Sequence, residues 1–175
     1  MLNSKPNNSN YNQGNYLPKY KDKVIKLNSL GGVYFRSSWE KKIMTWLDHN
    51  EKIIKWGAEC MKIPYQMTHF DNGNAKVKEH CYYPDFYYEM RNDSGVLKQV
   101  VVEVKPMKEY NMVIALNEGK LQVPEKGTKK LKNFEYDLKM AYKNKNKWET
   151  MINWCDKKGY EFIIITEQHL SKFNT

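Results

Sequence analysis

Apolar residues in the first third of the chain recur at the spacing of one helix face. The stripe consists of Trp39, Ile43, Trp46 and Leu47. This spacing is typical of an amphipathic helix, whose period is about 3.6 residues. Ser37 and, three residues later, Glu40 match a capping box, which marks a helix start. The polar residues 48–50 then end the stripe, so we predict a helix that begins near Ser37.

Shorter stretches rich in β-forming residues follow the predicted helix. Residues 53–56 and 61–65 are candidate strands, and the Asp-Asn-Gly-Asn segment at 71–74 is a strong turn signal. Residues 82–90 and 97–105 alternate in polarity on either side of a second turn, which predicts a β-hairpin.

The C-terminal half predicts one long helix and one strand. Residues 109–127 show no clear pattern, whereas residues 132–157 carry apolar side chains at roughly helical spacing. Gly159 is a typical helix stop, and residues 162–166 form an apolar run that predicts a buried strand. The order of helix, antiparallel strands, helix and strand predicts an α/β fold with a central mixed β-sheet flanked by helices.

The N-terminal segment differs in composition from the rest of the chain. Residues 1–28 are rich in Asn and Lys, contain few aliphatic side chains, and include Pro6 and Pro18. Such a segment is typical of an arm that becomes ordered on a partner. We therefore divide the chain into an arm, residues 1–28, and a domain, residues 29–175.

The overall composition supports one domain that works inside a cell. The 175 residues are 41% hydrophobic, which is enough for a core. No apolar run approaches the roughly 20 residues of a membrane span, and the polar residues 1–15 do not resemble a signal peptide. The three cysteines are widely separated, which argues against disulfides and against a zinc site.

Positive charge is concentrated in two segments of the chain. The net charge is +9, of which residues 1–28 carry five Lys against one Asp and residues 128–147 carry seven Lys against two acids. Localised positive charge favours a polyanionic partner, with nucleic acid first. A solvated Lys-rich helix face and a basic tail explain the charge equally well.

The register of the predicted hairpin over residues 82–90 and 97–105 determines which candidate catalytic side chains lie opposite one another. If its turn is centred on Ser94, the opposed pairs are Asp85 with Glu103, Tyr87 with Val101, and Glu89 with Gln99. Directly opposed side chains have Cβ atoms about 5 Å apart. Two carboxylates at that separation repel each other unless a cation neutralises them, and hard divalent cations prefer carboxylate oxygens.

Alternation along the strands separates a polar face from a core face. The polar face holds Asp85, Tyr87, Glu89, Gln99, Glu103 and Lys105, and the core face holds Phe86, Tyr88, Met90, Val100, Val102 and Val104. Lys105 projects beside Glu103, about 7 Å along the strand. An acid pair with a neighbouring lysine suits metal-assisted phosphodiester cleavage. The alternative is a surface sheet face with ordinary ion pairs, and a one-residue slip in register would remove the arrangement.

Three sequence motifs resemble those of a known nuclease class. Tyr83-Pro84-Asp85-Phe86 and Val102-Glu103-Val104-Lys105 resemble the PD-(D/E)xK signature. Residues 35–40 are similar to the first-helix motif of TnsA-type transposon endonucleases and of head completion nucleases of T-even-type tailed phages. The resemblance covers roughly residues 33–168 and implies a restriction-endonuclease-like fold.

The resemblance also implies a metal site and its ligands. Glu40, Asp85 and Glu103 would bind Mg²⁺, for which Mn²⁺ can substitute, and the Val104 carbonyl would supply another oxygen. Lys105 would be the catalytic lysine, in a catalytic set with the three acids. The competing role of Glu40 is the capping box, in which its carboxylate bends back to its own backbone.

Several residues are candidates for DNA contacts. Arg36 and Ser38 lie near a helix start, where backbone amides favour anions. Arg36 is equally well explained as a surface charge. The remaining candidates belong to the Lys-rich segment and are Lys129, Lys130 and Lys132.

These features together predict a Mg-dependent deoxyribonuclease. By resemblance, it would cleave DNA endonucleolytically, with exonucleolytic action as a further option, in phage head completion and head–tail joining. Its partners would be DNA and, through the N-terminal arm, head–tail connector proteins, with no membrane partner, in the virion and the host cytoplasm. One alternative is a non-catalytic virion assembly protein that keeps the nuclease fold and binds DNA through its basic segments. Another is a nucleic-acid-binding module without a viral role.

Overall fold

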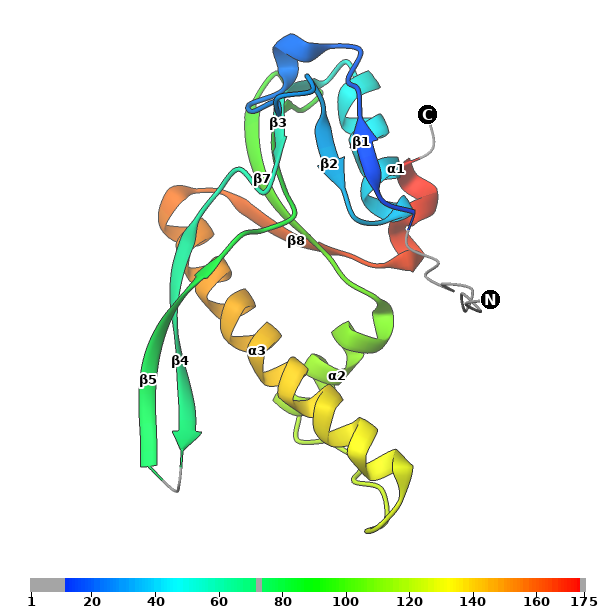
Figure 1. The fold of residues 1–175 in the computed structure, drawn as a ribbon. Coiled ribbons are helices and arrows are strands. Elements are labelled where there is room, and N and C mark those ends of the chain that lie inside the picture. Colours follow the sequence, from blue (N-terminus) through cyan, green and yellow to red (C-terminus); the bar gives the residue numbers. More distant parts are fainter. Residues whose placement is uncertain (1–11, 72–73, 174–175) are drawn as a thin grey trace, which may run out of the picture.

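A four-stranded mixed sheet forms the centre of the computed structural model, which describes residues 12–71 and 74–173. Its strand order is β3 (Ile53–Ala58), β6 (Phe86–Arg91), β7 (Leu97–Val104) and β8 (Glu161–Ile165). The neighbours β3, β6 and β7 are antiparallel, whereas β7 and β8 are parallel (Figure 1). This arrangement confirms the predicted α/β class with a central mixed sheet.

Helix α1 (Ser38–His49) packs against one face of the sheet. Ser37 caps the helix, because its side-chain oxygen accepts a hydrogen bond from the Glu40 amide at 3.2 Å. The apolar stripe buries Ile43 and Leu47 against the sheet face that carries Phe86. The predicted first helix and its start are confirmed.

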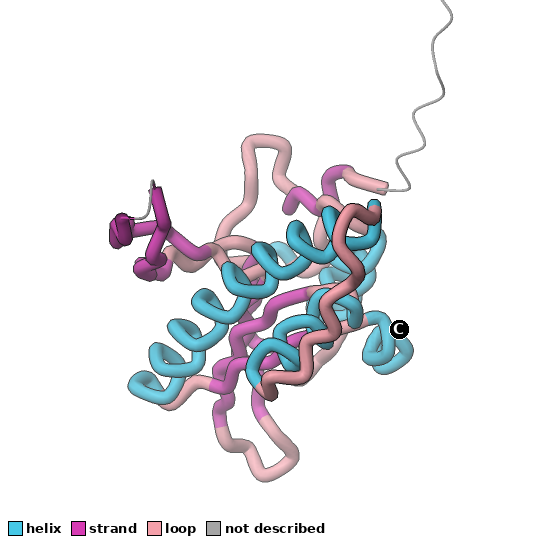
Figure 2. Tube along the Cα trace, turned by 90° about the horizontal axis from the view of Figure 1, so that it is seen from below, coloured by secondary structure: helices cyan, strands magenta, loops and turns pink. Residues whose placement is uncertain are grey.

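Helix α3 (Lys129–Lys158) covers the opposite face of the sheet, and in the view from below it runs across the strands (Figure 2). Its residues Met151 and Cys155 pack with Tyr87 and Val101, which alternate with the residues that face α1. The helix ends at Gly159, whose φ of 70° suits a residue without a Cβ. Within the two described ranges, no helix combines the length and the apolar character needed to cross a bilayer.

Helix α2 (Met107–Asn117) lies in the region that showed no clear sequence pattern. It begins directly after Pro106 and packs against α3, where Val113 meets Ala141 and Trp148. Val113 is the one buried residue of α2. The helix therefore lacks the continuous apolar stripe that would have predicted it.

A second hairpin, β4 (Ile63–Asp71) and β5 (Asn74–Tyr82), extends away from the central sheet beside α3 (Figure 1). Its base is buried through Ile63, Tyr65 and Tyr82, whereas most of β5 is exposed. The sequence predicted the first part of β4 but not the full length of the hairpin, and residues 72–73 of the predicted turn lie outside the described residues.

The described part of the N-terminal segment lies against the domain. Strand β1 (Gly14–Tyr16) pairs with β2 (Val33–Phe35), and Val24 is buried in the core shared with α1. Residues 12–28 are thus held by contacts within the chain, while residues 1–11 lie outside the described residues. The division of the chain at residue 28 stays a prediction.

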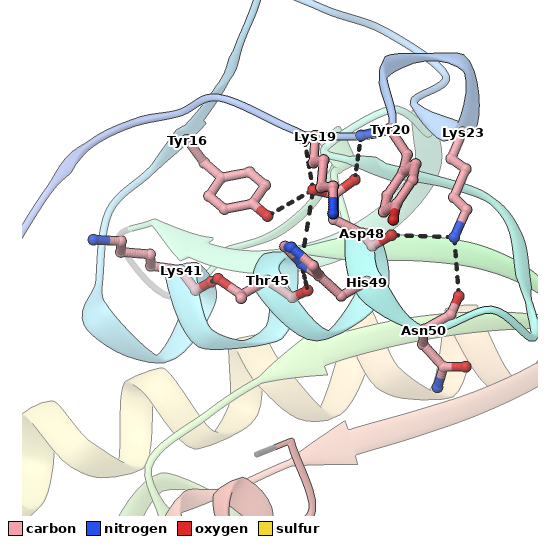
Figure 3. Close-up of polar contacts among 9 residues, drawn as sticks. All are labelled: Tyr16, Lys19, Tyr20, Lys23, Lys41, Thr45, Asp48, His49 and Asn50. Carbon is pink, nitrogen blue, oxygen red and sulfur yellow. Dashed lines mark hydrogen bonds and ion pairs between the residues drawn. The ribbon is translucent and has the colours of Figure 1, made fainter. Parts of the chain in front are cut away.

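Asp48, in the last turn of α1, anchors this segment (Figure 3). Its fully buried carboxylate accepts hydrogen bonds from the Tyr16 hydroxyl at 2.9 Å and from the amides of Lys19 and Tyr20 at 2.7 and 3.0 Å. The Lys23 ammonium donates to the Asp48 carbonyl at 3.1 Å. Burial and this carboxylate raise the pKa of Tyr16, so its hydroxyl stays a donor.

We expect Asp48→Ala to lower the free energy of unfolding by about 3 kcal/mol, because it leaves three donors to a buried charged acceptor unpaired. Denaturant unfolding measures the change. Glu51→Ala is the matched control, since Glu51 is exposed three residues further along the chain. Equal stability of the two variants would contradict the anchoring role of Asp48.

Candidate active site

The register of β6 and β7 positions the candidate catalytic residues. Tyr87 pairs with Val101 and Glu89 with Gln99, as the sequence predicted. Asp85 directly precedes β6, and Glu103 lies near the end of β7. The predicted register is confirmed over the paired residues, and it brings Asp85 next to the end of β7.

Asp85 and Glu103 form a pair of buried or half-buried carboxylates. Glu103 is only 2% exposed, and its Oε2 accepts a hydrogen bond from the Tyr82 hydroxyl at 2.6 Å. Asp85 Oδ2 accepts from the Val104 amide at 2.7 Å. Each acid is therefore fixed by one hydrogen bond, which leaves other carboxylate oxygens for a ligand.

Lys105 lies on the same side as this acid pair. Its Nζ is 3.4 Å from Glu103 Oε1, and its side chain is 24% exposed. Burial lowers the pKa of Lys105, but the carboxylates of Glu103 and Asp85 outweigh burial and leave the pKa above its usual value. The lysine is therefore a charged ammonium and hydrogen-bond donor rather than a base.

The acid pair carries an electrostatic cost. Burial, followed by the charge of Glu103, raises the pKa of Asp85 to about 7, although the Val104 amide and Lys105 oppose the shift. Two carboxylates that disfavour each other's ionisation are the donor set that a divalent cation relieves. The side chains of Asp85 and Glu103 thus fit a hard metal ion.

Glu40 faces the same region, but its carboxylate is engaged elsewhere. Its Oε2 accepts from the Arg36 amide at 2.9 Å, and its Oε1 accepts from the Ser37 hydroxyl at 3.1 Å. Glu40 and Asp85 both line a cavity of about 220 Å³, and the charge of Glu40 contributes to the raised pKa of Asp85. The capping role is therefore the one that the structure displays.

The predicted convergence of three acids is incomplete. Across residues 12–71 and 74–173, no group of three or more His, Cys, Asp or Glu side chains is arranged to hold a metal ion. Asp85, Glu103 and Lys105 are brought together, whereas the oxygens of Glu40 remain at the helix start. The assignment of Glu40 and of the Val104 carbonyl as ligands stays a prediction.

Arg36, a candidate for phosphate contact, is paired within the chain. Its guanidinium makes a two-pronged interaction with Glu59, with one N–O distance of 3.0 Å. Glu59 has an unusual φ of 45°, and its amide donates to the Asp85 carbonyl at 3.1 Å. Ser38 is exposed at the first turn of α1. A phosphate would therefore compete with Glu59 for the Arg36 guanidinium.

The predicted DNA-binding lysines lie far along α3 from the acid pair. Lys129, Lys130 and Lys132 occupy the first turn of the 30-residue helix and are exposed. Lys147, by contrast, interacts electrostatically with Glu103 and lies 15 or more residues further along the helix, a distance of about 25 Å. The structure does not bring the first-turn lysines to the acid pair.

Two residues of the site, Tyr82 and Lys147, were not predicted from the sequence. Tyr82 is 1% exposed, and the Lys147 ammonium lies 4.9 Å from the centre of its ring. Burial lowers the pKa of Lys147, and the charges of Lys105 and Lys143 lower it further. No local pattern marks either residue, because each reaches the site only through packing between β5, β7 and α3.

The mixed sheet, with an acid pair and a lysine at the end of a central hairpin, is the arrangement of a restriction-endonuclease-like nuclease. The family model described as "TnsA-like endonuclease N terminal" matches residues 50–167, and the chain belongs to this family. It is also similar to the head completion nuclease of Enterobacteria phage T4, with 31% identity over 138 residues, which cover 79% of this chain and 81% of that protein. These matches confirm the resemblance inferred from the motifs.

The range matched by the family model includes most of the candidate residues but not Glu40. Asp85, Glu103 and Lys105 lie inside the matched range, as do Tyr82 and Lys147. Glu40 precedes it. The candidate catalytic residues in the matched part are those that the structure also brings together.

We expect Mg²⁺ or Mn²⁺ to raise the melting temperature more at about pH 8 than at about pH 5.5. The pKa of Asp85 in the folded state is raised from its usual value near 4 to about 7. Between these pH values the folded state binds more protons than the unfolded state, so the free energy of unfolding falls as pH rises. A cation bound to the ionised pair restores stability above pH 7. Thermal unfolding with and without metal measures the effect.

Asp85→Asn should abolish the pH dependence of this metal shift. Asp93→Asn is the matched control, since Asp93 is an exposed acid paired with Lys52. A shift of the same size at both pH values in the unaltered protein would show that the ion binds away from Asp85.

Proposed function

We propose that the chain is a Mg-dependent deoxyribonuclease that hydrolyses phosphodiester bonds. One observation carries the proposal: Asp85 and Glu103 form a pair of carboxylates with the Lys105 ammonium 3.4 Å from Glu103. The chain belongs to an endonuclease family, and this cluster lies in the part that matches it.

Each residue has a distinct part in the proposed reaction. Asp85 and Glu103 would hold Mg²⁺, with Mn²⁺ as a substitute and the Val104 carbonyl as a further oxygen ligand. Bound Mg²⁺ would polarise the phosphate and lower the pKa of a water molecule. Lys105, held charged by the neighbouring acids, would offset the negative charge that develops as water attacks phosphorus in line with the leaving oxygen.

Tyr82 fixes the orientation of Glu103 in this scheme. Its hydroxyl donates a hydrogen bond to Glu103 Oε2, while Glu103 Oε1 faces Lys105. Burial and the charge of Glu103 raise the pKa of Tyr82, so the hydroxyl remains a donor. We therefore assign Tyr82 a positioning role.

Glu40 can serve as the third acid if it leaves the helix start. The Ser37 side chain caps α1 independently, because it accepts from the Glu40 amide at 3.2 Å. Turning the Glu40 carboxylate toward Asp85 would therefore cost the hydrogen bonds to the Arg36 amide and the Ser37 hydroxyl, but not the cap itself. This exchange would complete the predicted ligand set.

The T4 relative, a head completion nuclease, supports a proposal for the biological setting. We propose that this chain acts on DNA during phage head completion and head–tail joining, in the virion and the host cytoplasm. The proposed cleavage is endonucleolytic, with exonucleolytic action as an addition. The N-terminal arm would contact head–tail connector proteins, and Arg36, Ser38, Lys129, Lys130 and Lys132 would contact DNA.

A second candidate is a non-catalytic assembly protein that binds DNA through its basic segments. One observation favours it: within the described ranges no three acids are arranged around a metal position, and Glu40 is hydrogen-bonded at the helix start. Cleavage assays separate the two candidates directly.

We expect the protein to nick or linearise supercoiled plasmid with Mg²⁺ or Mn²⁺, and EDTA to abolish the activity. Lys105→Ala should lower the cleavage rate at least about 100-fold, because it removes the charge that offsets the developing anion. Its matched control is Lys98→Ala, on the same hairpin strand but in a half-exposed ion pair with Glu161. Full activity of Asp85→Ala and Glu103→Ala would place the active site elsewhere.

Glu40→Gln separates the ligand role from the capping role. The Gln carbonyl can still accept from the Arg36 amide, so the melting temperature should change by no more than a few degrees. Loss of the charged ligand should nevertheless reduce cleavage at least about tenfold and weaken the stabilisation by Mn²⁺. Unchanged cleavage together with reduced stability would show that Glu40 acts only at the helix start.

A further inference from the structure

Lys147 lies on the face of α3 that approaches the acid pair, but its ammonium is in direct contact with no carboxylate of the described residues. Among the described residues it forms no ion pair, and its close contact is the Tyr82 ring, 4.9 Å from its ammonium. Lys145, two residues earlier, is by contrast 2.6 Å from a Glu149 oxygen and from an Asn117 oxygen. Lys147 thus carries a positive charge without a direct ion-pair partner in a half-buried position.

This charge acts on the candidate active site. The charges of Glu103 and Asp85 attract the Lys147 ammonium, while those of Lys105 and Lys143 repel it. The ammonium nevertheless lies beyond ion-pair distance from both acids, over a tyrosine whose hydroxyl is bound to Glu103. A cation–π contact offsets only part of the cost of removing an ammonium from water.

A structural role explains this placement poorly. A lysine that only stabilised the fold would gain most by pairing with Glu103 or by extending into solvent. Here the ammonium remains beside the site without pairing with Glu103, whose Oε2 accepts from Tyr82 and whose Oε1 faces Lys105. What the ammonium lacks is an anion in direct contact, and the anion that would reach this site during the proposed reaction is a phosphate group.

We propose that Lys147 binds a non-bridging oxygen of a backbone phosphate in the bound DNA strand, next to the acid pair. The inference rests on the proposed function and names a substrate contact within it. Tyr82 links this contact to the site, because its ring holds the lysine and its hydroxyl holds Glu103. Lys143, one turn earlier on α3, extends the positive charge along the path of the strand.

The test is the salt dependence of binding to a short DNA duplex in EDTA, where no cleavage occurs. Neutralising one phosphate-binding lysine should reduce the slope of log Kd against log salt by about 0.9. We expect this reduction in Lys147→Gln, with binding roughly tenfold weaker at low salt. Lys147→Arg should retain most of the slope, since it keeps the charge.

Lys145→Gln is the matched control on the same helix turn, and its slope should equal that of the unaltered protein. Tyr82→Phe keeps the ring but loses the hydroxyl, so it should preserve the salt slope while lowering the cleavage rate. Thermal unfolding establishes that each variant is folded. An unchanged slope in folded Lys147→Gln, or an equal reduction in Lys145→Gln, overturns the proposal.

The binding assay tests the phosphate contact of Lys147 and the cleavage assay tests the nuclease proposal, so either proposal can fail without the other. If the slope falls in Lys147→Gln while the unaltered protein never cleaves DNA, the phosphate contact stands and the nuclease proposal fails. If cleavage occurs, Lys147→Gln should raise KM at least about fivefold with a smaller change in kcat, because the contact forms before the chemical step. A fall in kcat alone, with an unchanged slope, would contradict a phosphate-binding role.

Discussion

The antiparallel pairing of β6 with β7 is the constraint on which the rest of the site depends. Side chains alternate between faces along a strand, so the register that pairs Tyr87 with Val101 also sends Glu103 to the face of Tyr87. A slip of one residue would place Glu103 among the apolar residues that face α1 and would direct Val102 toward the site. The pairing thus decides at once which residues form the core and which form the acid pair.

Burial by α3 turns this acid pair into a chemically distinctive site. An exposed sheet face would leave the carboxylates screened by water, with little effect on their pKa values. Beneath α3, Glu103 is nearly inaccessible and the pKa of Asp85 is raised, while Lys105 remains charged. The same helix contributes Lys147, so the packing that creates the electrostatic cost also brings a group that favours a phosphate.

The sequence predicted those parts of the fold and site that depend on local periodicity. Turn position and alternation determine the hairpin, and they placed Asp85, Glu103 and Lys105 on one face. Helix α2 was not predicted because it buries only Val113, and β5 was not predicted because it is largely exposed. The hydrogen bond of Tyr82 with Glu103 joins residues 21 positions apart, a contact that only tertiary packing creates.

Glu40 shows why a motif cannot always settle a role. The pattern of Ser37 followed three residues later by a glutamate serves a helix cap and a metal ligand equally well, and the structure displays the cap. The cap survives without the Glu40 carboxylate, because Ser37 itself accepts from the helix amide. The two hydrogen bonds of the Glu40 carboxylate are exposed or half-buried and contribute about 1 kcal/mol each. They are the interactions that Glu40 would give up to join the acid pair in the proposed reaction.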